Sequence, residues 1–463
     1  MSEREEEARA QTMIPADNPI KDATQDTLGR AAVATRFAGE VLAQDVSEGM
    51  VVGVLGAWGS GKTSFVNLAR QEINERGATI LDFNPWMFSG AEQLVATFFV
   101  ELAAQLKLRP GLGEIGVGLE EYGEAFSGLG WLPFVGSWIE RGRLLNKGLS
   151  KFLQRQKEGV GQRRAKIERA LAALEKPIVV VLDDIDRLAT SEVRDVFKLV
   201  RLTASFPNVI YIVAFDRLRV ELALAEEGVP GRDYLEKILQ LAIDLPAVPE
   251  HVLSRQIFAA LDAALSTIER PGTLDEQAWP DVFMEVIRPL IRNMRDVRRY
   301  AVAVRGTVAA LDGQIALADL LALEAVRTFL PDVFVKMPGA IAGLTTPAPS
   351  FGGADPPILQ EQISELVDVA GERGGVLAAL VARLFPAAQR HLPRGTHYGA
   401  DWTKSWLRDR RVAHEEILRL YLERVAGERL EAFREAERAW AVMADEQALD
   451  EFLRSLDATA LKT

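Results

Sequence analysis

Eight consecutive residues, GAWGSGKT at positions 56–63, have the types and spacing of a phosphate-binding loop. Glycines allow successive main-chain N–H groups to turn inward around an anion. The Lys62 ammonium can reach β- and γ-phosphate oxygens, and the Thr63 hydroxyl is placed to hold Mg²⁺. The residues that we expect to contact nucleotide are Gly56, Ala57, Trp58, Gly59, Ser60, Gly61, Lys62, Thr63 and Ser64.

Two adjacent carboxylates, Asp183 and Asp184, follow the apolar run VVVL at 179–182. A core strand of this kind delivers such carboxylates to the crevice where ligands bind. By position, Asp183 is expected to hold Mg²⁺, mostly through water, and Asp184 to polarise an attacking water molecule. The alternative is that the pair only caps the helix that follows.

The elements that must position these groups alternate between strand and helix over 50–245. Short apolar runs bounded by glycine, proline or asparagine predict strands, and apolar positions at helical spacing predict helices. The predicted strands are 50–55, 78–83, the run after Pro177, 208–215 and 241–245, and the predicted helices are 29–45, 62–75, 90–108, 151–175, 190–205 and 233–241. This alternation predicts an α/β fold with a parallel sheet flanked by helices.

Strand signals stop after Pro249, so the rest of the chain is predicted to be helical. We divide the chain into a core at 1–249 with a helical, glycine-rich insertion at 109–175, an all-helical lid at 250–330, a linker at 331–357 and a C-terminal helical domain at 358–463. The linker is predicted from the high content of proline and glycine at 331–357. The charged segment 1–25 is predicted to be a mobile arm.

Composition excludes several classes of protein. The 463 residues include 54 Lys and Arg against 66 Asp and Glu, and a net charge of −12 argues against a globally basic nucleic-acid binder. The absence of cysteine excludes disulfides, zinc–thiolate sites, iron–sulfur clusters and thiol catalysis, and it fits the cytoplasm. The longest apolar segment, 125–139, is too short to span a bilayer, so a membrane role is unlikely. We expect segment 125–139 to form short buried helices. The alternative is that it lies at a membrane surface or is held by a partner.

Three further stretches resemble the KAP family of P-loop NTPases: FNPW at 83–86, VVVLDDIDRL at 179–188 and YLEKILQLAIDLP at 234–246. The resemblance implies the additional-strand core shared with AAA+ and signal-transduction ATPases, followed by a helical lid. It also implies ATP and Mg²⁺ as ligands. Many members carry transmembrane helices between the two nucleotide motifs, whereas this chain has only the glycine-rich insert at 109–150.

The resemblance extends to several single positions. Arg30, in DTLGR at 26–30, corresponds to an element near the base and ribose, although an ordinary helix start explains it equally well. Arg295 matches a lid arginine that can touch the γ-phosphate, and Arg299 lies one turn further on. A solvated basic helix face is the alternative for both.

Other side chains near the motifs keep more than one interpretation. Asp216 follows a core strand at the place of a γ-phosphate sensor, where it orients water or pairs with Arg217. Arg187 is a subunit-interface arginine or a local partner of Asp184 or Asp186. Trp86 is expected to pack at the end of its strand rather than to mark a surface, and Trp58 either covers the loop or contacts a neighbour.

These residues together predict an ATP-hydrolysing switch or motor. ATP is favoured over GTP because no guanine-reading N-K-x-D motif occurs. By analogy with bacterial relatives we expect a role in anti-phage defence, with self-association or a partner protein encoded nearby. The rival functions are a nucleotide-gated scaffold with slow hydrolysis and a nucleic-acid-stimulated ATPase. The basic groups that would serve the second rival are 163–164, 292–299 and 408–411.

Overall fold

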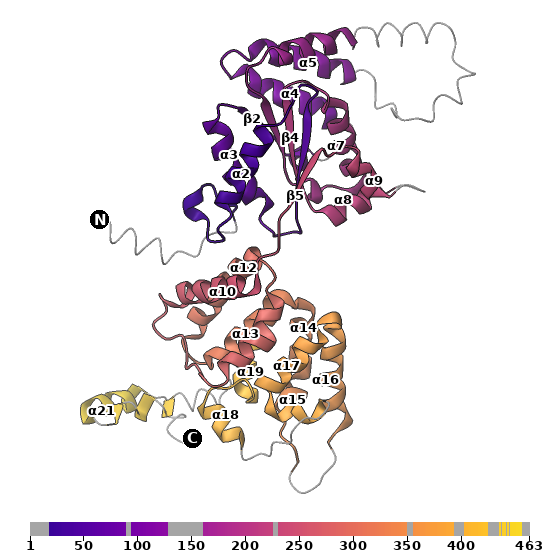
Figure 1. The fold of residues 1–463 in the computed structure, drawn as a ribbon. Helices are drawn as coiled ribbons and strands as arrows, with labels where there is room; N and C mark the ends of the chain where they lie inside the picture. The colour runs from indigo at the N-terminus through magenta and orange to yellow at the C-terminus, as the bar shows by residue number, and fades with distance from the viewer. Residues whose placement is uncertain are drawn as a thin grey trace. The chain divides into compact units, whose positions relative to one another are not determined.

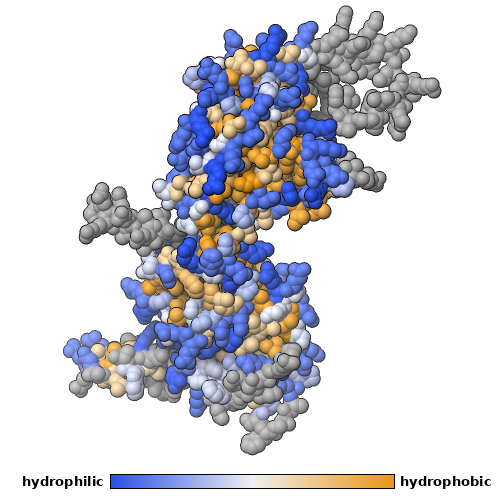
Figure 2. All heavy atoms as spheres, in the orientation of Figure 1, coloured by the Kyte–Doolittle hydropathy of each residue, from blue (hydrophilic) through white to orange (hydrophobic). Residues whose placement is uncertain are grey.

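The computed structural model describes most of the chain as two compact units. The described residues are 18–88, 94–127, 161–225, 230–349, 355–392, 402–424, 435–436, 438–440, 442–443 and 445–455. The first unit is Asn18–Val248, and the second begins at Pro249 (Figure 1). Figure 2 shows both hydrophilic and hydrophobic residues on the visible face of each unit.

Five parallel strands form the sheet of the first unit, in the order β2-β3-β4-β1-β5. Their bounds are β1 Met50–Leu55, β2 Thr79–Phe83, β3 Ile178–Leu182, β4 Val209–Phe215 and β5 Leu241–Asp244. The predicted α/β fold with a parallel sheet is therefore confirmed. Strand β4 lies between β1, which precedes the glycine loop, and β3, which precedes the paired carboxylates, so the sheet has the additional strand that the resemblance implies.

The sheet is buried on both faces because its strands are almost entirely apolar. Side chains alternate between two cores, so that Val180 and Tyr211 join one cluster while Val179 and Ile210 join the other. Helices α4 and α7 contribute to the first core, and α2 and α3 to the second (Figure 1). The helices of this unit are η1 Ala23–Gln25, α2 Ala31–Leu42, α3 Lys62–Glu75, η2 Pro85–Phe88, α4 Leu94–Lys107, α5 Gly113–Ser127, η4 Ile185–Arg187, α7 Thr190–Thr203, α8 Arg217–Leu224 and α9 Gly231–Glu236. Residues 161–172 are also helical.

The described part of the second unit is helical. Its elements are α10 Glu250–Leu265, α11 Trp279–Val282, η5 Phe283–Ile287, η6 Arg288–Leu290, α12 Met294–Leu311, α13 Leu317–Phe329, α14 Pro331–Lys336, η7 Met337–Ala340, α15 Ile341–Thr345, α16 Pro357–Val369, η8 Gly371–Arg373, α17 Gly374–Leu384, η9 Pro386–His391, α18 Thr403–Arg408, α19 Glu415–Glu423 and α21 Glu446–Ser455.

Helix α13 joins the predicted lid to the predicted C-terminal helices through two buried carboxylates. Asp319 accepts a hydrogen bond from Arg411 Nε at 2.7 Å and another from the Val412 N–H at 2.9 Å. Glu324 accepts from the Tyr421 hydroxyl at 2.8 Å. Both carboxylates are at most 1% exposed, so these contacts hold 250–330 and the later helices in one unit.

One prediction from the sequence is wrong, and a second is contradicted only where the structure describes the chain. The predicted linker 331–357 contains α14, η7 and α15, so it is helical over 331–345. The predicted mobile arm 1–25 is anchored where it is described, because Ile20 donates its N–H to Ser64 Oγ at 3.3 Å and accepts from Asn67 Nδ2 at 2.9 Å. Residues 1–17 lie outside the described ranges.

No described helix is both long and apolar enough to cross a bilayer. Of the predicted apolar segment 125–139, only the last residues of α5, 125–127, belong to the described chain.

Candidate active site

The glycine loop, Gly56–Gly61, connects the end of β1 to the first turn of α3. Gly59 and Gly61 have φ values of 80° and 89°, a region that side chains with a Cβ rarely enter. At Gly56 a Cβ would lie 2.5 Å from Ser60 Oγ, so a larger residue would displace the Ser60 side chain. The loop therefore ends on the N-terminus of a 14-residue helix, whose free N–H groups and dipole favour an anion.

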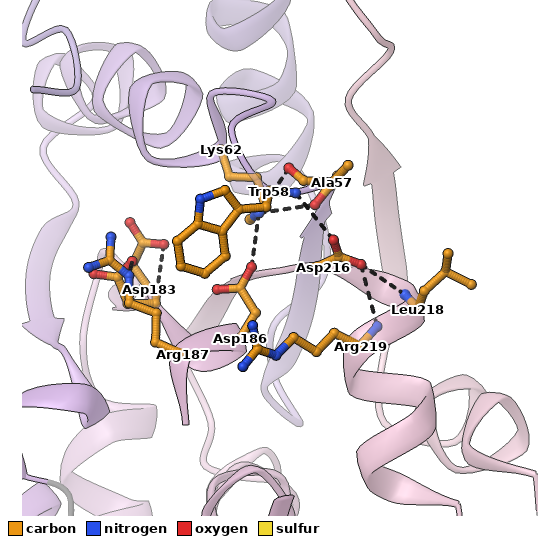
Figure 3. Close-up of polar contacts among 11 residues, drawn as sticks. Ala57, Trp58, Lys62, Asp183, Asp186, Arg187, Asp216, Leu218 and Arg219 are labelled. Carbon is orange, nitrogen blue, oxygen red and sulfur yellow. Dashed lines mark hydrogen bonds and ion pairs between the residues drawn. The ribbon is translucent and has the colours of Figure 1, made fainter. Parts of the chain in front are cut away.

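Lys62 is buried within the loop, and acceptors surround its ammonium group. Nζ donates to the carbonyl oxygens of Gly56 at 3.0 Å and Ala57 at 3.4 Å. It forms an ion pair with Asp186 Oδ2 at 3.1 Å, and the two residues are 8% and 4% exposed (Figure 3). These three contacts match the three donors of an ammonium group. A phosphate must therefore replace one of them to bind Lys62.

Thr63 and Asp183 meet at the junction of α3 and β3. The Thr63 hydroxyl lies near the Asp183 carboxylate, and the Asp184 N–H donates to Asp183 Oδ1 at 2.8 Å. Burial raises the pKa of Asp183, while the nearby Thr63 hydroxyl acts in the opposite direction. A hydroxyl and a carboxylate are hard oxygen donors that suit Mg²⁺. The described residues hold no group of three or more metal-ligating side chains, so such an ion would also need phosphate or water ligands.

Asp184 is held by two other side chains. Its Oδ1 pairs with Arg187 Nε at 2.7 Å, and its Oδ2 accepts from Asn84 Nδ2 at 3.2 Å. Its backbone is left-handed, with φ 60°, and its side chain makes no capping hydrogen bond to the 3₁₀ turn that follows. The helix-cap alternative is therefore wrong for Asp184, and Arg187 is a local partner of this carboxylate.

Asn84 and Asp186 are the site residues that sequence reasoning missed. Asn84 follows β2, and the register pairs Phe83 with Leu182, so the parallel sheet places Asn84 beside the acids that follow β3. Its position in FNPW at a strand end was the available signal. Asp186 is the third acidic residue of DDID, which indicates that it lies near the site. The sequence does not show that its partner is Lys62.

Two exposed tryptophans lie against Arg187. The guanidinium carbon is 5.5 Å from the centre of the Trp58 ring and 5.3 Å from that of Trp86, within cation–π range. Trp58 is 45% exposed and Trp86 is 49% exposed. The expectation that Trp86 packs at its strand end is therefore wrong, because half of its surface is open and it contacts Arg187.

Asp216 lies at the end of β4 and faces the loop from the other side. It caps α8 by accepting from the N–H groups of Leu218 at 3.1 Å and Arg219 at 3.4 Å, and Oδ2 accepts from the Trp58 N–H at 3.2 Å (Figure 3). Arg217 instead pairs with Glu221, at 3.9 Å. The predicted Asp216–Arg217 pair is therefore wrong, and Asp216 ties the loop to the end of β4.

Arg30 reaches the glycine loop from the start of α2. Its Nη1 donates to the Ser60 carbonyl oxygen, and its Nη2 donates to that of Pro246 at 2.8 Å. The side chain thus links the loop to the residues that follow β5. Contact with a base or ribose remains a prediction.

Arg295 and Arg299 belong to the second unit. Arg295 lies in the first turn of α12 and is half-buried. Arg299 donates to the Thr328 carbonyl oxygen at 3.4 Å and lies over the Phe329 ring. A contact of either arginine with the γ-phosphate remains a prediction.

The predicted basic groups contain charges that are compensated locally. Arg164 pairs with Glu168 at 2.7 Å, and Arg292 with Asp296 at 3.4 Å. Arg411 pairs with the buried Asp319. These ion pairs weaken the interpretation of the groups as a nucleic-acid footprint.

Asp186→Asn is expected to lower the unfolding free energy of the nucleotide-free protein by about 3 kcal/mol, because it removes one partner of a buried ion pair. A bound triphosphate would supply the missing negative charge, so a non-hydrolysable ATP analogue should raise the Tm of this variant more than that of the wild type. Urea and thermal unfolding with and without analogue measure both effects.

The matched control is Asp195→Asn, which breaks a more exposed ion pair with Lys198 and should cost less than about 1 kcal/mol. Equal stabilisation of Asp186→Asn and wild type by the analogue would mean that phosphate does not replace the Asp186 carboxylate.

Comparison with known protein families places the sheet and loop in context. The sequence profile of the KAP family P-loop domain matches residues 30–311. The chain is 29% identical over 259 residues to the phage T7 exclusion protein of Escherichia coli (strain K12). That alignment covers 50% of this chain and 34% of the relative, so the aligned region is about a third of the relative's length.

Similar solved structures include the Aeropyrum pernix ORC1 protein in complex with DNA and Thermotoga maritima RuvB. The first is 12% identical with a TM-score of 0.33, over 83% of this chain and 98% of that chain. The second is 12% identical with a TM-score of 0.31, over 82% of this chain and 94% of that chain. Because these TM-scores are low, the two structures support no further conclusion. The fold class follows from the order of the strands in the sheet.

Proposed function

The chain belongs to the KAP family of P-loop proteins, and on that premise we propose that it binds ATP with Mg²⁺ and hydrolyses the ATP as a nucleotide-driven switch or motor. The observation that carries the proposal is the buried ion pair between Lys62 and Asp186, at 3.1 Å. It brings the end of the glycine loop to the acids that follow β3, although 124 residues separate the two side chains. This is the arrangement that a Mg²⁺-dependent phosphoryl transfer requires.

The loop supplies the groups that bind a triphosphate. Inward main-chain amides and the N-terminus of α3 receive the phosphate oxygens, and Lys62 exchanges Asp186 for a phosphate. Thr63 and Asp183 would hold Mg²⁺, which neutralises charge on the phosphates when bound. Arg30 fixes the Ser60 carbonyl, so it orients the loop from the side of α2.

Hydrolysis then depends on Asp184. Its carboxylate accepts a proton from a water molecule whose oxygen bonds to the γ-phosphorus, while the bond from that phosphorus to the β–γ bridging oxygen breaks. The products are ADP and inorganic phosphate. Lys62 stabilises the charge on the leaving and transferring groups. We further propose that Arg295 contributes a guanidinium to the γ-phosphate from α12.

Steady-state phosphate release tests the proposal directly. We expect turnover that requires Mg²⁺, stops with a chelator and is faster with ATP than with GTP. The same assay is run with and without single- and double-stranded DNA at two salt concentrations. The absence of both nucleotide binding and turnover would overturn the proposal.

A nucleotide-gated scaffold is the second candidate function. The observation that favours it is that both oxygens of Asp184 are engaged, by Arg187 and Asn84, which slows hydrolysis until they separate. Tight ATP binding without turnover, together with nucleotide-dependent assembly, would select this function. A large and salt-sensitive stimulation by DNA would instead select a nucleic-acid-dependent ATPase.

We propose a cytoplasmic role in defence against phage, through self-association or a partner encoded nearby. The support is the 29% identity to a phage exclusion protein over half of this chain. Plaque counts on cells that express the wild type or a Lys62→Ala variant test the role. Equal plating efficiency on both across several phages would reject it.

A further inference from the structure

Arg187 is held beside the glycine loop by three side chains from different parts of the chain. Trp58 comes from the glycine loop, Trp86 from the turn after β2, and Asp184 from the end of β3. The guanidinium lies against both rings and donates from Nε to the carboxylate at 2.7 Å. Its side chain is 32% exposed, so it is reachable from solvent. Figure 3 shows Arg187 beside Trp58 at the loop.

The same contact occupies the carboxylate that hydrolysis requires. Asp184 has one oxygen on Arg187 and the other on Asn84, so a water molecule that donates to it must share an oxygen with one of them. Asn84 is neutral and can remain. Arg187 carries the charge that stabilises the carboxylate in its present position, so it must move away from Asp184 before hydrolysis.

We propose that Arg187 exchanges Asp184 for the terminal phosphate of the bound nucleotide, and so makes the site distinguish a triphosphate from a diphosphate. This rests on the proposed nucleotide binding. A terminal phosphate offers three oxygens and about two negative charges, whereas the carboxylate offers one charge, and a planar guanidinium binds phosphate through two parallel hydrogen bonds. Trp58 belongs to the loop that binds the phosphates, so the guanidinium is stacked next to the place where the terminal phosphate arrives.

The exchange also explains the two exposed tryptophans. Stacking on both rings limits the conformations of a long side chain and so reduces the entropy that Arg187 loses when it binds phosphate. The same movement frees Asp184 for water. Because ADP lacks the terminal phosphate, Arg187 stays paired with Asp184 when ADP is bound.

Calorimetric titration of the full chain with Mg²⁺ plus either ADP or a non-hydrolysable ATP analogue tests this. Arg187→Gln is expected to weaken analogue binding by about 10-fold to 100-fold, the loss expected for charged hydrogen bonds, while ADP affinity changes by less than about twofold. Arg187→Lys keeps the positive charge but loses the planar guanidinium, so its affinity for the analogue should lie between those of the wild type and Arg187→Gln. The matched control Arg232→Gln removes an exposed guanidinium that pairs with Glu236 and should change neither affinity.

Tryptophan emission supplies a second readout. The analogue, but not ADP, should change the emission of the wild type, and Trp58→Phe with Trp86→Phe should abolish the change. Equal weakening of analogue and ADP by Arg187→Gln, or an emission change that survives in Arg187→Gln, would overturn the inference. A wild type that binds neither nucleotide would instead overturn the proposed function.

Discussion

Lys62→Ala is expected to weaken the binding of MgATP by at least about 100-fold and to abolish turnover. In the proposed complex with MgATP, the ammonium group would make charged hydrogen bonds to two phosphates, each worth about 1.5–3 kcal/mol. Its removal also leaves the Asp186 carboxylate buried without a cation beside the phosphate site, where it repels the nucleotide. Calorimetric titration and phosphate release measure the two effects.

A double variant separates the two contributions. Lys62→Ala with Asp186→Ala removes the repulsion, so its affinity should recover in part but remain well below that of the wild type. Lys198→Ala is the control, because Lys198 is a partly exposed lysine of the same unit and pairs with Asp195. Wild-type affinity in Lys62→Ala would show that the glycine loop is not the nucleotide site.

Asp184→Asn is expected to lower kcat by about 10³-fold, within the range for loss of a general base, without weakening MgATP binding. The amide keeps the shape of the side chain and can still bond Asn84, but it cannot accept the proton. The variant should therefore retain bound ATP in single-turnover experiments.

Asp82→Asn provides the comparison, since it removes an exposed carboxylate of the same sheet that pairs with Arg70. It should leave both kcat and affinity unchanged. A collapse of MgATP affinity in Asp184→Asn would mean that Asp184 is a ligand of Mg²⁺, and its role and that of Asp183 would have to be exchanged.

The sheet could be predicted because its strands are buried on both faces, and such strands are continuous apolar runs. Met50–Leu55 has the predicted bounds, and the alternation with helices gave the parallel arrangement. The glycine loop could be predicted for a similar reason, since positive φ values favour glycine at Gly59 and Gly61. These are local properties, and a sequence expresses them directly.

The missed features depend on contacts between distant segments. Asn84 meets Asp184 only because β2 pairs with β3, across 100 residues of sequence. Lys62 meets Asp186 in the same way, and nothing in the sequence ranks Asp186 above Asp184 as its partner. The pair between Arg187 and Asp184 is local, and the sequence offered it as one of the interpretations of Arg187.

The predicted linker is wrong over 331–345 because the prolines and glycines of this segment do not interrupt its helices. Pro331 occupies the first turn of α14, where the missing N–H costs nothing. Val333, Met337, Ile341 and Leu344 are all at most 3% exposed and recur every three or four residues, which is a helical spacing. The signal for helices was therefore present.

The buried carboxylates of α13 have a mechanical consequence. Asp319 and Glu324 fasten this helix to Arg411 and Tyr421, so α13 cannot shift without carrying α19 along or exposing an unpaired charge. A displacement of any part of this bundle would therefore move α13 and α19 together.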